Sequence, residues 1–201
     1  FNEKQLKRIP EKGPVIVVAN HPLGGIERLL LIKYLGKIRT DIKILGNPLL
    51  QKVDPLAGYF INQKPKLNLI PGKKAAALPN ELKTHLENGG MLCLFPSGSG
   101  STFHPFYGLT DKVWQLQLIK FIKEAGVPVL PVFFQGKPGK MVAVMMKMNP
   151  VFNGFQPAIK KLNLKIRIGN PISLKIQNKI TDEYQYGRYL RAKTFGMQTK
   201  I

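Results

Sequence analysis

Short runs of consecutive apolar residues recur along the chain and predict strands that are buried on both faces. Residues 14–20 form a β-branched run that ends at Asn and Pro, as a buried strand does. Further strands are expected at 41–46, 58–62, 91–95, 127–134, 141–148 and 164–169. Because parallel sheets are covered on both faces, unbroken apolar runs of this kind favour a largely parallel sheet.

Apolar positions at helical spacing predict helices between these runs. The expected helices are 26–36, 79–90, 111–126 and 181 to about 195, and the clearest of them, 111–126, is expected to start at Asp111. Residues 96–110, rich in Gly, Ser and Pro, are expected to form a long loop. The alternation predicts an α/β fold, with one domain over 1–201 and a largely parallel mixed sheet flanked by helices. Since the chain begins at Phe1 without Met, a missing N-terminal segment is left open.

The charge balance indicates an anionic partner. Lys and Arg number 31 against 11 Asp and Glu, for a formal net charge of +20. This excess suits nucleic acid, anionic lipid headgroups, an acidic carrier protein or a phosphorylated substrate. The basic residues are spread through the chain without a nucleic-acid-binding signature, which disfavours nucleic acid. The sequence has no apolar stretch of about 18 residues, the minimum for a membrane span, so a cytoplasmic or membrane-surface protein is expected.

Cys93, His85 and His104 are predicted to have no part in the chemistry. Cys93 is the only cysteine and lies in an apolar run, which predicts a buried, unreactive thiol and excludes an internal disulfide. We predict no metal site. His104 is expected to order its loop and His85 to be exposed, while Trp114 and its helix are expected to be mostly core. Arg188 and Arg191, with the lysines at 73, 74, 160 and 161, are expected to be solvated charges that could together meet a bilayer or an acidic acyl carrier protein.

His21 stands where the first strand gives way to the first helix, and Glu27 follows six positions later in "NHPLGGIE". In a continuous helix, residues six apart would point about 240° apart and could not meet. Gly24 and Gly25 allow a turn that brings the Glu27 carboxylate onto one imidazole nitrogen. Such a pair can act as a general base on a hydroxyl. The alternative is that His21 caps the strand and Glu27 complements the helix N-terminus; these residues alone do not decide.

Four blocks occur in the order and at the separations of a known family. They are "NHPLGGIE" (20–27), "GYFINQ" (58–63), "FPSGSGS" (95–101) and "VPVLPV" (127–132). On these blocks the chain resembles the glycerolipid acyltransferases of the lysophosphatidic acid acyltransferase superfamily, over about residues 13–196. It is most similar to the bacterial branch often labelled hemolysin-like, which makes amino-acid-containing lipids such as ornithine lipids.

The resemblance implies a glycerol-3-phosphate acyltransferase-like fold and a reaction. His21 would take the proton of an acceptor hydroxyl that attacks an acyl thioester of acyl carrier protein or coenzyme A, and Glu27 would hold the imidazole. No other cofactor is implied, and the protein would lie peripherally on the cytoplasmic face of the inner membrane. The loop 96–101 could offer backbone N–H groups and hydroxyls to a headgroup or oxyanion. The expected substrate-binding residues are Asn20, Gly24, Gly25, Phe60, Asn62, Lys64, Phe95, Pro96, Ser97, Gly98, Ser99 and Ser101.

The departures from the family concern the acceptor. Ser97 and Gly100 replace a glutamate and an arginine, and Gln63 replaces another arginine, which leaves Lys64 as the nearest basic residue. A phosphate acceptor is normally met by fixed charges, so we expect a neutral or zwitterionic lyso-amino-acid lipid in preference to lysophosphatidic acid. A lipid-binding relative without activity stays open. A serine hydrolase is disfavoured, because Ser97 stands where a Gly-x-Ser-x-Gly elbow around Ser99 needs glycine.

Overall fold

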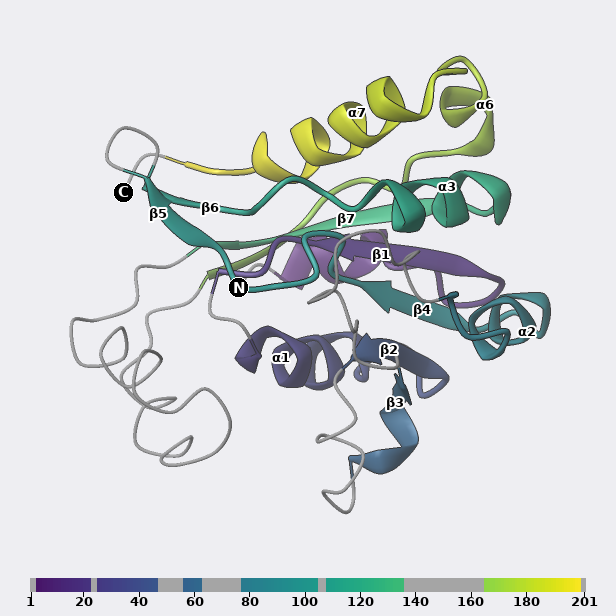
Figure 1. Ribbon diagram of the computed structural model, residues 1–201. Helices are drawn as coiled ribbons and strands as arrows, with labels where there is room; N and C mark the ends of the chain where they lie inside the picture. Colours follow the sequence, from purple (N-terminus) through teal and green to yellow (C-terminus); the bar gives the residue numbers. More distant parts are fainter. Residues whose placement is uncertain are drawn as a thin grey trace.

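The computed structural model describes residues 3–22, 25–46, 56–62, 77–104, 108–135 and 165–199, and a six-stranded sheet forms its centre (Figure 1). The strands, in spatial order, are β3 (Phe60–Asn62), β2 (Ile42–Gly46), β4 (Met91–Leu94), β1 (Val15–Ala19), β7 (Val129–Gln135) and β8 (Lys165–Ile168). All neighbours pair in parallel except β7 and β8, which are antiparallel. The predicted largely parallel mixed sheet is therefore confirmed.

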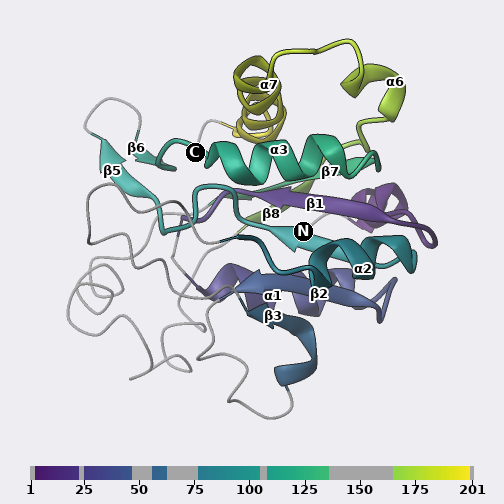
Figure 2. The same ribbon diagram turned by 45° about the vertical axis from the view of Figure 1, so that its right-hand side comes forward.

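Helices cover both faces of this sheet (Figure 2). One face carries α1 (Ile26–Leu35) and the short 3-10 helix η1 (Glu3–Arg8); the other carries α2 (Glu81–Glu87), α3 (Leu116–Glu124) and α7 (Glu183–Phe195). Alternate residues of β1 serve the two layers: Val17 packs in the cluster with α1, and Val18 in the cluster with α3 and α7. This double burial explains the unbroken β-branched run in the sequence.

Two predictions about the segment that follows β4 were wrong. Residues 96–110 are not all loop, since β5 (Thr102–His104) pairs antiparallel with β6 (Gly108–Thr110). The next helix begins at Leu116 rather than at Asp111, because the Asp111 carboxylate is bonded to the chain after β1 and residues 111–115 stay non-helical. A 3-10 helix η3 (Ala57–Tyr59) and a short helix α6 (Leu174–Gln177) were not predicted. The expected strand 141–148 lies outside the described residues.

Arg39 ties together the loops at the amino edge of the sheet. Arg39 is buried, and its guanidinium donates hydrogen bonds to the carbonyls of Gly13 (2.6 Å) and Gly89 (2.7 Å) and to Asp41 Oδ1 (2.8 Å). The hydrogen bonding of Arg39 to the Asp41 carboxylate holds the pKa of Asp41 below its usual range. The loops before β1, β2 and β4 are thus fixed at this edge, and the opposite edge carries the polar residues of the candidate site.

The structure also tests what the sequence predicts for the burial of Cys93 and His85, which lie away from that site. Cys93 is buried in β4, and burial raises the pKa of its thiol, so the predicted buried cysteine is confirmed. His85 was predicted to be exposed, but it is half-buried, and its Nε2 lies 3.1 Å from the Met91 carbonyl oxygen. Among the helices of the described residues, none combines the length and the apolar character that crossing a bilayer requires.

Candidate active site

The candidate site lies at the carboxyl ends of the parallel strands. Asn20 and His21 follow directly after β1, and Phe95 follows directly after β4, the neighbouring strand. In parallel α/β sheets, ligands bind beyond the carboxyl ends of the strands. The first histidine of the sequence therefore stands where this fold places reactive groups.

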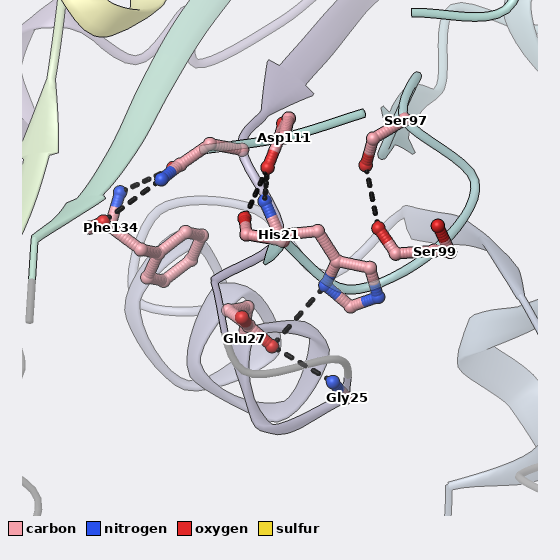
Figure 3. A network of polar contacts seen from close by, with 9 residues as sticks. His21, Gly25, Glu27, Ser97, Ser99, Asp111 and Phe134 are labelled. Atoms are coloured by element: carbon pink, nitrogen blue, oxygen red, sulfur yellow. Dashed lines mark hydrogen bonds and ion pairs between the residues drawn. The ribbon is translucent and has the colours of Figure 1, made fainter. Parts of the chain in front are cut away.

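His21 and Glu27 are in contact (Figure 3). The imidazole Nδ1 lies 3.3 Å from Glu27 Oε2, and the two side chains are 1 % and 0 % exposed. The Gly25 N–H donates a 2.9 Å hydrogen bond to the same oxygen, which aims the carboxylate at the imidazole. The predicted approach of the two side chains is confirmed; Gly24, the other glycine of the turn, lies outside the described residues. The second ring nitrogen, Nε2, points away from Glu27 (Figure 3).

Asp111 fixes the main chain of His21, and sequence reasoning missed it. Its carboxylate accepts hydrogen bonds from the His21 N–H (3.0 Å), the Ser101 hydroxyl (2.5 Å) and the Trp114 indole N–H (3.2 Å). The Ser101 N–H also donates to the His21 carbonyl at 2.8 Å. Buried polar groups bonded in this way are costly to disturb, so His21 is held through backbone atoms on both sides of its Cα.

Arg191 extends this anchor to α7. Its guanidinium donates to Thr110 Oγ1 (3.0 Å) and to the Asp111 carbonyl (3.2 Å), and lies 4.9 Å from the Phe195 ring centroid. The prediction that Arg191 is a solvated charge was wrong, since these contacts half-bury it; Arg188 is exposed, as expected. The lysines at 73, 74, 160 and 161 lie outside the described residues.

Asn20 joins β1 to β7. Its side-chain amide donates to the Phe134 carbonyl (3.0 Å) and its side-chain oxygen accepts from the Phe134 N–H (2.7 Å). Asn20 is 3 % exposed. The two bonds extend the sheet pairing up to His21 and favour a positioning role for Asn20 over the predicted contact with substrate.

The turn after β4 is folded tightly beside the histidine. The Gly98 N–H donates to the Phe95 carbonyl (2.9 Å), and the buried Ser97 hydroxyl donates to the Ser99 carbonyl (2.9 Å; Figure 3). Gly98 has φ +66°, and a Cβ there would fall 1.7 Å from the side-chain nitrogen of Gln115. Only glycine fits this position without strain.

The predicted contacts in this turn differ in exposure. Gly98 is exposed and Ser99 half-buried, so both can be reached from outside. Pro96 is buried, and its carbonyl accepts from the N–H of Gln115, just before α3. The hydroxyls of Ser97 and Ser101 already have protein partners. The substrate-binding roles of Pro96, Ser97, Gly98, Ser99 and Ser101 stay predictions. Gly98 and Ser99 are the best placed for such contacts, because both can be reached from outside.

The Phe95 ring lies close to both the His21 imidazole and the Arg28 guanidinium. The His21 ring centroid lies 4.6 Å from that of Phe95, and the Arg28 guanidinium carbon lies 5.2 Å from the same centroid. Arg28 was missed by sequence reasoning, although it follows Glu27 directly in the chain. A Cβ added at Gly46 would lie 3.7 Å from Arg28 Nε, so this side chain reaches toward the end of β2.

The predicted residues in and just after the second block, 58–63, come from the other edge of the sheet. Phe60 is 2 % exposed and belongs to the core cluster under α1, which accounts for its burial by packing, and its contact with substrate stays a prediction. Asn62 is exposed at the end of β3, three strands from β1, which corresponds to about 14 Å at the usual strand spacing. Lys64 and the side chain of His104 lie outside what the structure describes. Within the described residues, no three His, Cys, Asp or Glu side chains cluster as a metal site requires.

Comparisons with known proteins identify the family of the chain. A family model described as "Acyltransferase" matches residues 1–135. The chain is similar to a "Lyso-glycine lipid O-acyltransferase" of Phocaeicola vulgatus, at 27 % identity over 135 residues that cover 67 % of this chain and 46 % of that protein. It is also similar to a protein of the same name in Bacteroides thetaiotaomicron, at 28 % identity over 135 residues, 67 % of this chain and 47 % of that protein. The matched part thus spans about half the length of these curated relatives.

Proposed function

The chain belongs to the acyltransferase family, and from this premise we propose that it transfers a fatty acyl group from an acyl thioester to the hydroxyl of a lyso-amino-acid lipid. The contact between His21 and Glu27 is the observation that carries the proposal. The family match covers this pair, the Asp111 anchor and the turn at 95–101.

In the proposed reaction, His21 acts as the general base. Glu27 holds Nδ1 in its protonated form, so Nε2 is free to accept the proton of the acceptor hydroxyl as its oxygen attacks the thioester carbonyl. The new C–O bond forms, the C–S bond of the tetrahedral intermediate breaks, and the imidazolium returns the proton to the leaving thiolate. The products are an ester and a free thiol. Such base assistance contributes about 10²–10⁴-fold, and the burial of the pair strengthens its electrostatics.

The acceptor is proposed from the substitutions near the site. Ser97 and Gly100 stand where related enzymes that use a phosphate acceptor carry charged residues. The relatives named for lyso-glycine lipid support an acceptor in which a 3-hydroxy fatty acid is amide-linked to an amino acid. Lysophosphatidic acid is the second candidate, with Lys64 supplying a positive charge.

A competition assay tests this choice. Purified protein receives one acyl thioester and equal amounts of N-(3-hydroxypalmitoyl)glycine and lysophosphatidic acid, and both products are measured by mass spectrometry. We expect the amino-acid lipid to be acylated preferentially. A preference for lysophosphatidic acid would contradict the proposed acceptor, while binding of both lipids without transfer would favour a non-catalytic lipid-binding protein.

The donor is proposed to be a thioester of acyl carrier protein or coenzyme A, with no additional cofactor. Acyl carrier protein is acidic and coenzyme A carries phosphates, and the net charge of +20 suits both. Comparing kcat/KM for the two thioesters of one fatty acid identifies the donor.

We expect binding to anionic membranes that depends on salt. The net charge of +20 and a lipid acceptor favour peripheral attachment, proposed at the cytoplasmic face of the inner membrane, with each Lys or Arg near the surface contributing about 1 kcal/mol. Co-sedimentation with phosphatidylglycerol vesicles should fall steeply as the salt concentration rises from about 50 to about 500 mM, because higher ionic strength screens the attraction between the protein and the lipid headgroups. Co-sedimentation with phosphatidylcholine vesicles should be weak. Equal, salt-independent binding to both vesicles would refute an electrostatic attachment.

A further inference from the structure

The positively charged side chain of Arg28 lies near the same aromatic ring as His21, the proposed base. It belongs to the first turn of α1, and its guanidinium carbon is 5.2 Å from the Phe95 ring centroid. The His21 imidazole is 4.6 Å from that same centroid. A cation and a general base therefore share one aromatic side chain as a common support.

The surroundings of Arg28 favour a bound anion. Burial lowers the pKa of its guanidinium, and the nearby charge of Glu27 opposes this effect without cancelling it. A second anion beside the guanidinium would compensate the cost of burial further. A Cβ placed at Gly46, the last residue of β2, would lie 3.7 Å from Nε, so the guanidinium lies beside the carboxyl end of this strand, at the edge of the sheet where ligands bind.

We propose, on the basis of the proposed function, that Arg28 binds the free carboxylate of the amino-acid headgroup of the acceptor and thereby presents its hydroxyl to His21. An N-acylated amino acid keeps its α-carboxylate, which matches the two parallel N–H donors of a guanidinium. Between that carboxylate and the 3-hydroxyl lie only the amide, the α-carbon and a short stretch of acyl chain. This short span fits two protein groups held on one phenyl ring.

A second source of the same anionic chemistry is the donor, because the phosphopantetheine arm carries phosphate. The two sources make different kinetic predictions. If Arg28 binds the acceptor, its replacement raises KM for the acceptor and leaves KM for the acyl thioester unchanged. If it binds the donor, the reverse is expected, and the proposal is wrong.

The direct test uses a ligand that cannot react. N-palmitoylglycine has the carboxylate but no hydroxyl, and its methyl ester has neither charge nor hydroxyl. Binding of both to the full chain is measured by calorimetry for wild type, Arg28→Met, Arg28→Lys and Lys33→Met. Lys33 is an exposed cation on the same helix and serves as the matched control.

We expect wild type and Lys33→Met to bind the acid about tenfold more tightly than the ester. Arg28→Met should bind acid and ester equally, and Arg28→Lys should retain part of the preference. Because the ester is an internal reference, a folding defect would weaken both ligands and would not mimic this result. An unchanged acid preference in Arg28→Met would overturn the proposal.

Failure of the proposed role of Arg28 can be distinguished from failure of the proposed function. If wild type acylates N-(3-hydroxypalmitoyl)glycine but shows no preference for acid over ester, the proposed function stands and the role of Arg28 is wrong. If wild type prefers the acid through Arg28 but transfers no acyl group, the carboxylate site stands and the proposed function is wrong.

Discussion

Replacing His21 with alanine is expected to lower kcat for acyl transfer by about 10²–10⁴-fold, because the imidazole is the proposed base for the acceptor hydroxyl. The fold should survive, since His21 is held by its own N–H to Asp111 and by its carbonyl to Ser101. Alanine keeps both of these backbone groups. Initial rates of purified protein with a long-chain acyl thioester measure the effect, and thermal unfolding reports the fold.

His85→Ala is the matched control for this experiment. His85 is half-buried and bonded to the Met91 carbonyl at the start of β4, whereas the candidate site lies beyond its end. This variant should lose stability without losing its turnover when folded. If His21→Ala turned over at a near-normal rate while folded, His21 would not be the base.

Replacing Glu27 with glutamine is expected to reduce kcat by about 10- to 100-fold, less than the loss of His21. Glutamine keeps the size of the side chain and an oxygen that can accept from the Gly25 N–H. It removes the negative charge that stabilises the imidazolium across the 3.3 Å contact, and the expected 10- to 100-fold loss corresponds to about 1.4–2.7 kcal/mol of this stabilisation.

Glu27→Ala completes this series. It removes the oxygens as well as the charge, so it should be slower than Glu27→Gln and should also leave the Gly25 N–H without this acceptor. Rates measured at one saturating donor concentration order the three proteins. Wild-type turnover in Glu27→Gln would show that the carboxylate serves only the packing of the turn.

The sheet and the contact between His21 and Glu27 could be expected from local sequence, because each depends on a pattern within a few residues. Unbroken apolar runs such as 15–19 mark strands covered on both faces, and the strand-to-helix junction placed His21 at the carboxyl edge. The two glycines before Glu27 predicted the turn that the 3.3 Å contact requires. Each of these features depends on neighbours in the chain.

The features that were missed depend on distant partners. Asp111 lies 90 residues from His21, and its position ahead of an apolar stretch resembles a helix cap. Its carboxylate instead accepts hydrogen bonds from the His21 N–H after β1, the Ser101 hydroxyl and the Trp114 indole N–H, and the segment before Leu116 is not helical. Phe60 was assigned to substrate through its block, whereas packing under α1 determines its burial. Local pattern could not foresee these tertiary bonds.

The central claim is an ester formed at the expense of a thioester under the control of His21. The most direct measurement incubates the purified protein with an acyl thioester and N-(3-hydroxypalmitoyl)glycine, and follows free thiol and O-acylated product together. The proposed function predicts one thiol released for each ester formed by the wild type, and both rates lowered together by about 10²–10⁴-fold in His21→Ala. Thiol released without ester, or ester formed equally by His21→Ala, would contradict it.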